Sequence, residues 1–457
     1  MATATHATIT TTPAGRLAWR NWGGNQACTP LSLEKPGSEP EIVELVRAAA
    51  ARGERVKVFG AGHSFTDIAC TDGRLVSLDR YDRVLEVDAE AATIKVEAGI
   101  TIARLGEILE GYGMAQPNLG DIAYQSIAGA ISTATHGTGA RLGNIATQVN
   151  AISLVTADGG LLECTADHNP DVFAAARVGL GALGVVSTVT LQCVPGFTLR
   201  SVQTPRGLNE VLEQIEELTA QNDHFEFFWV PHSDRVLAIA NNRTEAPPNP
   251  PGRLSAYFND MLIENHAFGL LQRVGRARTN WIPGLGRLTA RLLSGREVVD
   301  QSHRVFANER LVRFVEMEYA LPREALAAAV REVRSMIEHK GLRISFPVEV
   351  RVAAGDDIWL STATGRDTGY VAVHVFQGLP FEAYFREVEA IMNGHDGRPH
   401  WGKMHFQTAA SLRPRYPHWD DFIHVRDRLD PGGRFSNDYL DRVLGMAPGR
   451  AERPEAG

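Results

Sequence analysis

The segment from Ser126 to Gly139 constrains the fold of this chain most strongly, because it is built almost entirely from small residues. It runs SIAGAISTATHGTG, and side chains of this size fill a hydrophobic core poorly. They do let the backbone approach a flat or extended ligand closely, and they supply hydroxyl and amide donors. The segment therefore indicates either a ligand-contacting loop or a tightly packed structural loop.

A second glycine-rich segment follows a short strand predicted over residues 56–59. Phe59 leads into Gly60-Ala61-Gly62-His63-Ser64, and the open backbone N–H groups of such a turn can form an anion-binding concavity. A tight turn without a ligand has the same local sequence. Two such segments in one domain favour a large nucleotide cofactor with a diphosphate.

A third segment, Gly179 to Gly184, matches the GxGxxG pattern of dinucleotide-binding proteins. That pattern works only when a strand precedes the glycine turn and a helix follows it, so that the pyrophosphate meets the helix N-terminus. Here a helix predicted from Asn169-Pro170 precedes the turn, and a strand predicted over residues 185–193 follows it. The reversed order argues against a Rossmann site and a nicotinamide dehydrogenase.

The chain of 457 residues is too long for one compact core, and the predicted elements divide near residue 196. Before this point, helices and strands mix without a regular βαβ alternation. After it, strands are predicted over 225–230, 236–240, 312–319, 344–352 and 370–376, with helices over 211–218, 324–339 and 381–392. This order favours an α+β fold whose second domain is an antiparallel sheet covered by helices on one face.

Charge and composition narrow the class of function further. A net charge of −8 argues against nucleic-acid binding, which needs a basic surface. The N-terminus has no secretory signal, and no run of about 18 apolar residues occurs, so a cytoplasmic location is expected. The four scattered cysteines lack metal-ligand or CxxC spacing, so we expect free thiols and no metal site.

Residues 254–300 are predicted to be helical and contain six arginines between Arg273 and Arg296. The simplest interpretation is a solvated helix face. The alternative is a peripheral contact with an anionic membrane surface or with an acidic redox partner.

Combined, these motifs resemble a known superfamily. Val58-Phe59-Gly60-Ala61-Gly62-His63-Ser64 and Thr135-His136-Gly137-Thr138-Gly139 resemble the vanillyl-alcohol-oxidase flavoproteins. Phe346-Pro347-Val348-Glu349-Val350-Arg351 and His400-Trp401-Gly402-Lys403 resemble the aldonolactone oxidoreductases within it. The resemblance implies a two-subdomain PCMH-type FAD-binding domain over 28–196 and a substrate-binding cap domain over 197–410. It also implies a C-terminal segment, 411–446, that packs back on the FAD domain, and residues 447–457 are expected to be a disordered tail.

The resemblance implies FAD as cofactor, and His63 lies where many members bond covalently to the flavin 8α-methyl group. Other members bind FAD non-covalently, and a loop histidine with a structural role is the alternative for His63. The predicted cofactor-binding residues are Phe59, Gly60, Ala61, Gly62, His63, Ser64, Gly120, Ser126, Gly129, Ser132, Thr135, His136, Gly137, Gly184 and Val186. Gly120 is a candidate for the small residue that family comparisons link to oxygen reactivity.

Glu349 and Arg351 are two residues apart on a predicted strand, so both point to one face, roughly 7 Å apart. From the residues alone they suit a surface ion pair. The resemblance instead places them above the flavin, where Arg351 would hold substrate oxygens and Glu349 would orient or deprotonate a hydroxyl. It also suggests Lys403 as a positive charge near the flavin, His374 as a pocket or core histidine, and Ser126 as a substrate contact.

The implied activity is FAD-dependent oxidation of an aldono-1,4-lactone (L-gulono-, L-galactono- or D-arabinono-lactone) at the hydroxyl carbon beside the carbonyl. Hydride would pass to flavin N5, giving an ascorbate-type product. An alditol oxidase of the same fold and a non-catalytic flavin-binding protein are the alternatives. Oxygen, a cytochrome and a quinone-type compound all suit the sequence as electron acceptor.

Overall fold

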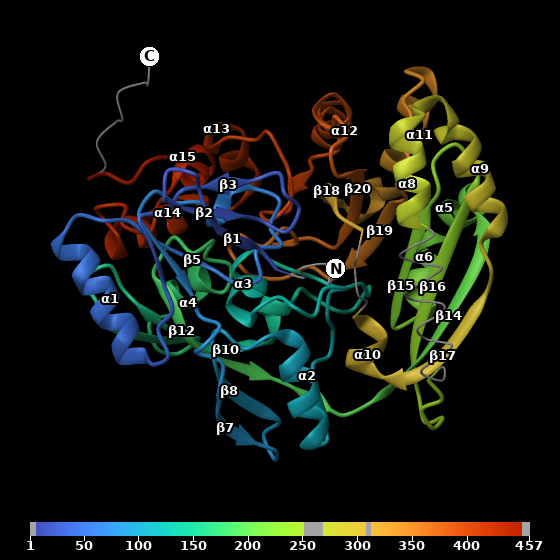
Figure 1. The fold of residues 1–457 in the computed structure, drawn as a ribbon. Coiled ribbons are helices and arrows are strands. Elements are labelled where there is room, and N and C mark those ends of the chain that lie inside the picture. The colour runs from blue at the N-terminus through green and yellow to red at the C-terminus, as the bar shows by residue number, and fades with distance from the viewer. Residues whose placement is uncertain (1–5, 251–267, 308–311, 450–457) are drawn as a thin grey trace.

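The computed structural model describes residues 6–250, 268–307 and 312–449, and its elements form two groups that lie side by side (Figure 1). Both groups mix helices with sheets, so the predicted α+β class is confirmed. Helix α1 (Glu39–Ala51) shows how the sequence sets an element. Its N-cap Ser38 accepts a hydrogen bond from the backbone N–H of Glu41, and Ile42 and Val46 bury one helical face.

The first group contains two principal sheets and the short strands of the N-terminus. A parallel sheet has the order β4 (Ser32–Glu34), β6 (Arg74–Ser77), β5 (Val56–Phe59). An antiparallel sheet has the order β11 (Leu161–Thr165), β10 (Val149–Val155), β12 (Val185–Gln192), β8 (Thr93–Glu97), β7 (Val84–Asp88). The other elements are β1 (Thr8–Thr11), β2 (Leu17–Arg20), β3 (Ala27–Cys28), η1 (Asp67–Ala69), α2 (Ile102–Gly111), β9 (Met114–Ala115), α3 (Ile127–Ser132), η2 (Ile145–Gln148), α4 (Pro170–Ala176) and β13 (Val194–Pro195).

The second group is built on an antiparallel sheet that has eight strands within the described residues. Their order is β17 (Arg296–Gln301), β14 (Thr198–Gly207), β16 (Arg235–Thr244), β15 (His224–Trp229), β19 (Val348–Ala353), β20 (Thr368–Phe376), β18 (Phe314–Pro322), β21 (Arg398–Pro399). The helices are α5 (Leu208–Glu213), α6 (Ile215–Gln221), α8 (Phe268–Ala277), α9 (Ile282–Leu292), α10 (Ser302–Phe306), α11 (Leu326–His339) and α12 (Glu382–Gly394). The predicted antiparallel sheet with covering helices is therefore present.

Two large hydrophobic cores match the two groups. One core joins Ile42 of α1 and Val56 of β5 to Phe422 and Tyr439, which come from the C-terminal helices. These helices are α13 (Ala409–Leu412), α14 (Trp419–Leu429) and α15 (Asp438–Leu444), drawn in red beside the blue N-terminal elements in Figure 1. The other core lies between the eight-stranded sheet and helices α11 and α12, and includes Phe385.

Some predicted elements differ from the structure. The prediction of helix over residues 254–300 is wrong at its C-terminal end, because Arg296–Gln301 is strand β17 and pairs with β14. Cross-strand pairing there overrides a local pattern that lacked period-two alternation. The predicted helix over 211–218 is divided into α5 and α6 at Gln214. Residues 254–267 of the arginine-rich stretch and residues 450–457 of the expected tail lie outside the described residues.

Two expectations about the chain as a whole can also be compared with the structure. The four cysteines are free thiols, as expected, and two of them, Cys28 and Cys70, share a side-chain hydrogen bond. Among the described residues, no helix combines the length and the apolar character needed to cross a bilayer.

Candidate active site

A cavity of about 370 Å³ lies in the first group of elements. Its walls come from the segment after β5, from the start of the small-residue segment, and from the turn between α4 and β12. Residues on this third wall include Leu180, Gly181, Gly184 and Val186. The GxGxxG segment therefore lines the cavity although its strand and helix order rules out a Rossmann turn.

Glycine lets the walls of this cavity approach one another closely. A Cβ atom on Gly60 would lie 2.4 Å from Oγ of Ser126, so the two glycine-rich segments are in direct contact. Gly184 has a φ of +156°, and a Cβ there would lie 2.7 Å from the carbonyl oxygen of Val155. Backbone groups rather than side chains thus form much of the wall, which suits an extended dinucleotide such as FAD.

Lys57 lines the same cavity, and sequence reasoning missed it. Its ammonium is buried and lies 3.3 Å from the carbonyl oxygen of Gly181 and 3.2 Å from that of Phe435. Burial lowers the pKa of Lys57 to about 7. Lys57 therefore ties β5 to the glycine turn and to the C-terminal segment. A lysine in the middle of an apolar strand, Val56 to Phe59, was the available signal.

The structure places the predicted cofactor-binding residues in two positions. Those that line the cavity are Phe59, Gly60, Ala61, Gly62, His63, Ser64, Ser126, Gly129, Ser132, Gly184 and Val186. Gly120, Thr135, His136 and Gly137 lie outside its lining, toward the eight-stranded sheet. His136 stacks on Tyr370 of β20 with ring centroids 3.6 Å apart, and the N–H of Gly139 donates to the carbonyl of Val352 in β19. The small-residue segment thus begins at the cavity and ends beside Arg351.

Arg351 lies at the centre of a buried group of carboxylates. Its Nε donates to Glu226 at 2.5 Å, and its Nη2 lies 2.6 Å from Glu349 and also bonds to Asp121. Glu349 and Arg351 are only 7% and 8% exposed, so the alternative of a surface ion pair is wrong. The neighbouring strand β15 and the loop before α3 supply the burial that the local sequence could not show.

Lys403 and His374 meet at another buried carboxylate, Glu316 of β18. Lys403 forms an ion pair with Glu316, and Nε2 of His374 lies 3.5 Å from Glu316 and 3.9 Å from Glu349. Burial raises the pKa of Glu316, but Lys403 and His374 outweigh this effect and lower it to about 2. The four predicted catalytic residues, Glu349, Arg351, Lys403 and His374, therefore lie in one connected network.

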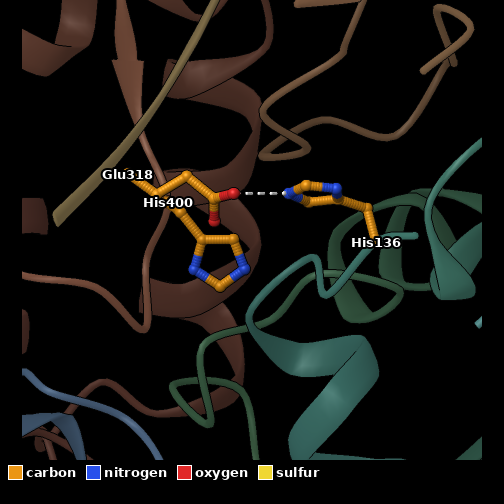
Figure 2. A group of neighbouring side chains, drawn as sticks. All are labelled: His136, Glu318 and His400. Atoms are coloured by element: carbon orange, nitrogen blue, oxygen red, sulfur yellow. Dashed lines mark ion pairs between the residues drawn. The ribbon is translucent and has the colours of Figure 1, made fainter. Parts of the chain in front are cut away.

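Glu318, two residues further along β18, lies between His136 and His400 (Figure 2). Nε2 of His136 is 3.4 Å from Glu318, while Nδ1 of His136 contacts the carbonyl of Gly137. Nδ1 of His400 accepts from the N–H of Gly402, so neutral His400 carries its proton on Nε2. Burial lowers the pKa of His400 to about 3. Glu318, His136 and His400 thus form one compact buried group, in which His400 offers a donor on Nε2.

The network adjoins the His63 end of the cavity. The N–H of Phe65 donates to the carbonyl of Gly402 at 2.7 Å, and Lys403 lies 5.3 Å from the ring centroid of Phe65. The ring of His63 stacks on Trp22 at 5.0 Å. The part of a ligand that lies beside His63 in the cavity would thus face the buried charges of this network.

Sequence reasoning missed the acidic members Asp121, Glu226, Glu316 and Glu318. Glu316 and Glu318 share one face of the otherwise apolar strand FVEMEYALP, and Glu226 interrupts the aromatic strand HFEFFW. A carboxylate inside a strand that is buried on both faces needs a cation partner. That pattern was the signal for these three residues, whereas Asp121 lies in a loop and gave none.

Fold and site together define a flavoprotein oxidoreductase with a PCMH-type FAD-binding fold. A family model described as an FAD binding domain matches residues 30–165. A solvent-stable cholesterol oxidase shares the fold with a TM-score of 0.81 and 18% identity, over 96% of this chain and 98% of its own. The cholesterol oxidase of B. sterolicum aligns with a TM-score of 0.79 and 17% identity, over 96% and 97%.

The chain belongs to the D-arabinono-1,4-lactone oxidase family, whose model matches residues 189–443. An L-gulono-1,4-lactone dehydrogenase of Mycobacterium tuberculosis is 47% identical over 93% of this chain and 99% of its own length. The L-gulonolactone oxidase of Mus musculus is 37% identical over 94% and 98%. An alditol oxidase of a Streptomyces species is 32% identical over 93% and 98%. The predicted family is thereby confirmed.

Proposed function

We propose that this protein oxidises an aldono-1,4-lactone (L-gulono-, L-galactono- or D-arabinono-lactone) at the hydroxyl carbon beside the carbonyl, giving an ascorbate-type product. The observation that carries the proposal is the buried Glu349–Arg351 pair, which lies with Lys403 and His374 beside the His63 end of the cavity. Relatives named for gulonolactone and arabinonolactone support the lactone class of substrate.

FAD in the cavity would supply the two-electron acceptor, taking a hydride at N5. The residues of this chain would do the rest. Arg351 would hold substrate oxygens through its guanidinium, and Glu349 would orient the hydroxyl and accept its proton. Lys403 would place a positive charge beside the reacting part of the flavin. Because the site is buried, this charge would stabilise developing negative charge more strongly than it would in water. His374, in contact with both Glu316 and Glu349, would relay or hold the proton.

The test is anaerobic mixing of the purified flavoprotein with L-gulono-, L-galactono- and D-arabinono-1,4-lactone, with xylitol and sorbitol in parallel. Loss of the oxidised-flavin absorbance with a lactone supports the proposal. Reduction only by the open polyols would favour the alditol oxidase instead. Failure of every compound to reduce the flavin would indicate a non-catalytic flavin-binding protein, and equal reduction rates in the parent and a Glu349→Ala variant would show that Glu349 has no part in the reaction.

We also propose that FAD is attached covalently through His63. The support is that His63 lines the cavity and that Trp22 fixes its ring by stacking. Acid precipitation of the parent should leave yellow flavin in the pellet, whereas a His63→Ala variant should release its flavin into the supernatant. Release of flavin from the parent would show non-covalent binding.

The electron acceptor can be oxygen, a cytochrome or a quinone-type compound. Measuring the rate at which each one reoxidises the lactone-reduced protein distinguishes these three. Gly120 bears on this choice because a Cβ there would lie 3.1 Å from the carbonyl oxygen of His136. If Gly120 controls oxygen access, a Gly120→Ala variant should be reoxidised by oxygen more slowly, with the rate for a soluble dye unchanged.

A further inference from the structure

The stretch from Phe268 to Arg296 has a charge opposite to that of the whole protein. It contains six arginines and no aspartate or glutamate, although the net charge of the chain is −8. In the structure it forms α8, the short turn η4 (Thr279–Trp281) and α9, which lie at the opposite end of the molecule from α1 (Figure 1). The arginines at positions 273, 276, 278, 287 and 291 are exposed.

Helix α9 and Trp281, which directly precedes it in η4, expose a row of large apolar side chains. Ile282, Gly286 and Ala290 are buried and attach the helix to the protein. Trp281, Leu288 and Leu292 are 58%, 49% and 69% exposed. Their spacing of seven and then four residues places them on one side of a helix, away from the buried face. Exposed apolar residues scattered singly are ordinary, but a continuous row indicates an interaction surface.

Arginines flank this apolar row. Arg287 and Arg291 are four residues apart, and they lie on α9 between the buried face and the apolar row by helical geometry. Both side chains are exposed, as are those of Arg273 and Arg278, so their positive charges face solvent.

We propose that this surface, defined by Trp281, Leu288, Leu292, Arg287 and Arg291, docks on an anionic lipid bilayer. Guanidinium groups bind lipid phosphates through paired hydrogen bonds, while tryptophan and leucine enter the boundary between headgroups and acyl chains. An acidic protein would satisfy the arginines but would leave the exposed apolar row unexplained. The proposal rests on exposed side chains and is independent of the lactone reaction.

Helix α8, which precedes this surface in the chain, is connected to the cofactor cavity by a short series of contacts. Arg276, at the end of α8, lies over the ring of Phe376 and donates to the carbonyl of Gln377. The side chain of Gln377 donates to the carbonyl of Gly23, next to the Trp22 that stacks on His63.

The experiment is sedimentation of the full-length flavoprotein with vesicles of phosphatidylcholine alone or mixed with phosphatidylglycerol. We expect binding to the mixed vesicles only. A triple variant, Trp281→Ser with Leu288→Ser and Leu292→Ser, should lower the bound-to-free ratio at least about tenfold, and so should Arg287→Gln with Arg291→Gln. Flavin content and turnover with a soluble dye should be unchanged in both.

Matched substitutions elsewhere provide the control. Leu161→Ser removes a leucine that is 57% exposed on β11, and Arg200→Gln removes an exposed arginine of β14, so neither should alter vesicle binding. Failure of the parent to bind mixed vesicles at low salt would overturn the proposal. Loss of binding in the arginine variant but not in the apolar variant would also overturn it, because the protein would then adsorb through charge alone without using the apolar row.

Discussion

At the residue scale, the role proposed for Arg351 depends on which of its donors the protein already uses. A guanidinium has five N–H groups. Nε bonds to Glu226, and Nη2 meets both Asp121 and Glu349. These contacts use Nε and Nη2, so under the proposed function Nη1 would be the group that donates to substrate oxygens. Glu226 pairs across the sheet, since Phe227 lies opposite Val350 and the register continues to Arg351.

We predict that Glu226→Ala lowers kcat/KM for the lactone by about 10- to 100-fold, because a small displacement of a positioning group is costly in catalysis. Glu226→Gln, which keeps an oxygen acceptor for Nε, should recover part of the loss. Steady-state kinetics on both variants, with flavin content measured, is the test. Glu297→Ala breaks the exposed Arg200–Glu297 pair of the same sheet, with an Nε–Oε1 distance of 2.8 Å, and should have no effect. Equal activity of all three variants would contradict the prediction.

The buried amine of Lys57 gives a pH dependence of stability. Its pKa is about 7 in the folded protein and 10.5 ordinarily, so the unfolded chain binds more protons between these values. Stability therefore rises as pH increases through this window, and Lys57→Met should remove the rise. From pH 7 to roughly pH 9.5, the unfolding free energy of the parent should therefore rise by about 3 kcal/mol relative to that of the Met variant.

Urea unfolding at the two pH values measures this effect. Lys35→Met is the matched control, because Lys35 is 42% exposed and pairs with Asp79 at 2.6 Å. A constant difference for Lys57→Met across the window would show that the amine stays charged when buried.

At the scale of elements, the contact between the two glycine-rich segments shapes the cofactor cavity. Oγ of Ser126 accepts from the N–H of Gly129 and caps α3, and it faces Gly60 across the contact. An alanine at position 60 would push this hydroxyl out of its capping position. We predict that Gly60→Ala destabilises the protein by about 1 kcal/mol and lowers its FAD content.

Gly111→Ala is the control, because a Cβ at the end of α2 meets nothing within 4 Å. It should leave FAD content unchanged and stability equal or slightly higher. FAD released by denaturation and the thermal midpoint are the measurements. An FAD content at the parental level in Gly60→Ala would show that the contact does not shape the cavity.

At the scale of the whole molecule, the two separate hydrophobic cores lead to different predictions for truncations in each. Phe422 of α14 and Phe385 of α12 are both fully buried, one in each core. Truncating either to alanine should cost about 3–5 kcal/mol. Phe422→Ala should speed amide exchange in α1 and β5 and reduce FAD retention, because the C-terminal helices share their core. Phe385→Ala should speed exchange in α11 and β20 with FAD retained. The same exchange pattern in both variants would contradict a boundary near residue 196.

The sequence by itself determined the local helices, strands and turns, and the motifs through which the chain resembles its family. The glycine-rich segments, the Ser38 cap and the strand alternation around Glu349 depend on residues close together in the chain, so spacing alone reveals them. The same locality explains the error at β17, where pairing with β14, about 100 residues away, decides the conformation.

Only the tertiary structure decided the electrostatics of the candidate site. Asp121 and Glu226 are 230 and 125 residues from the Arg351 that they contact. The Glu349–Arg351 pair is buried, and not on the surface, because β15 and the loop before α3 cover it. Ion pairs of this kind form between side chains that strand register and loop closure bring together, and a local pattern carries no information about either.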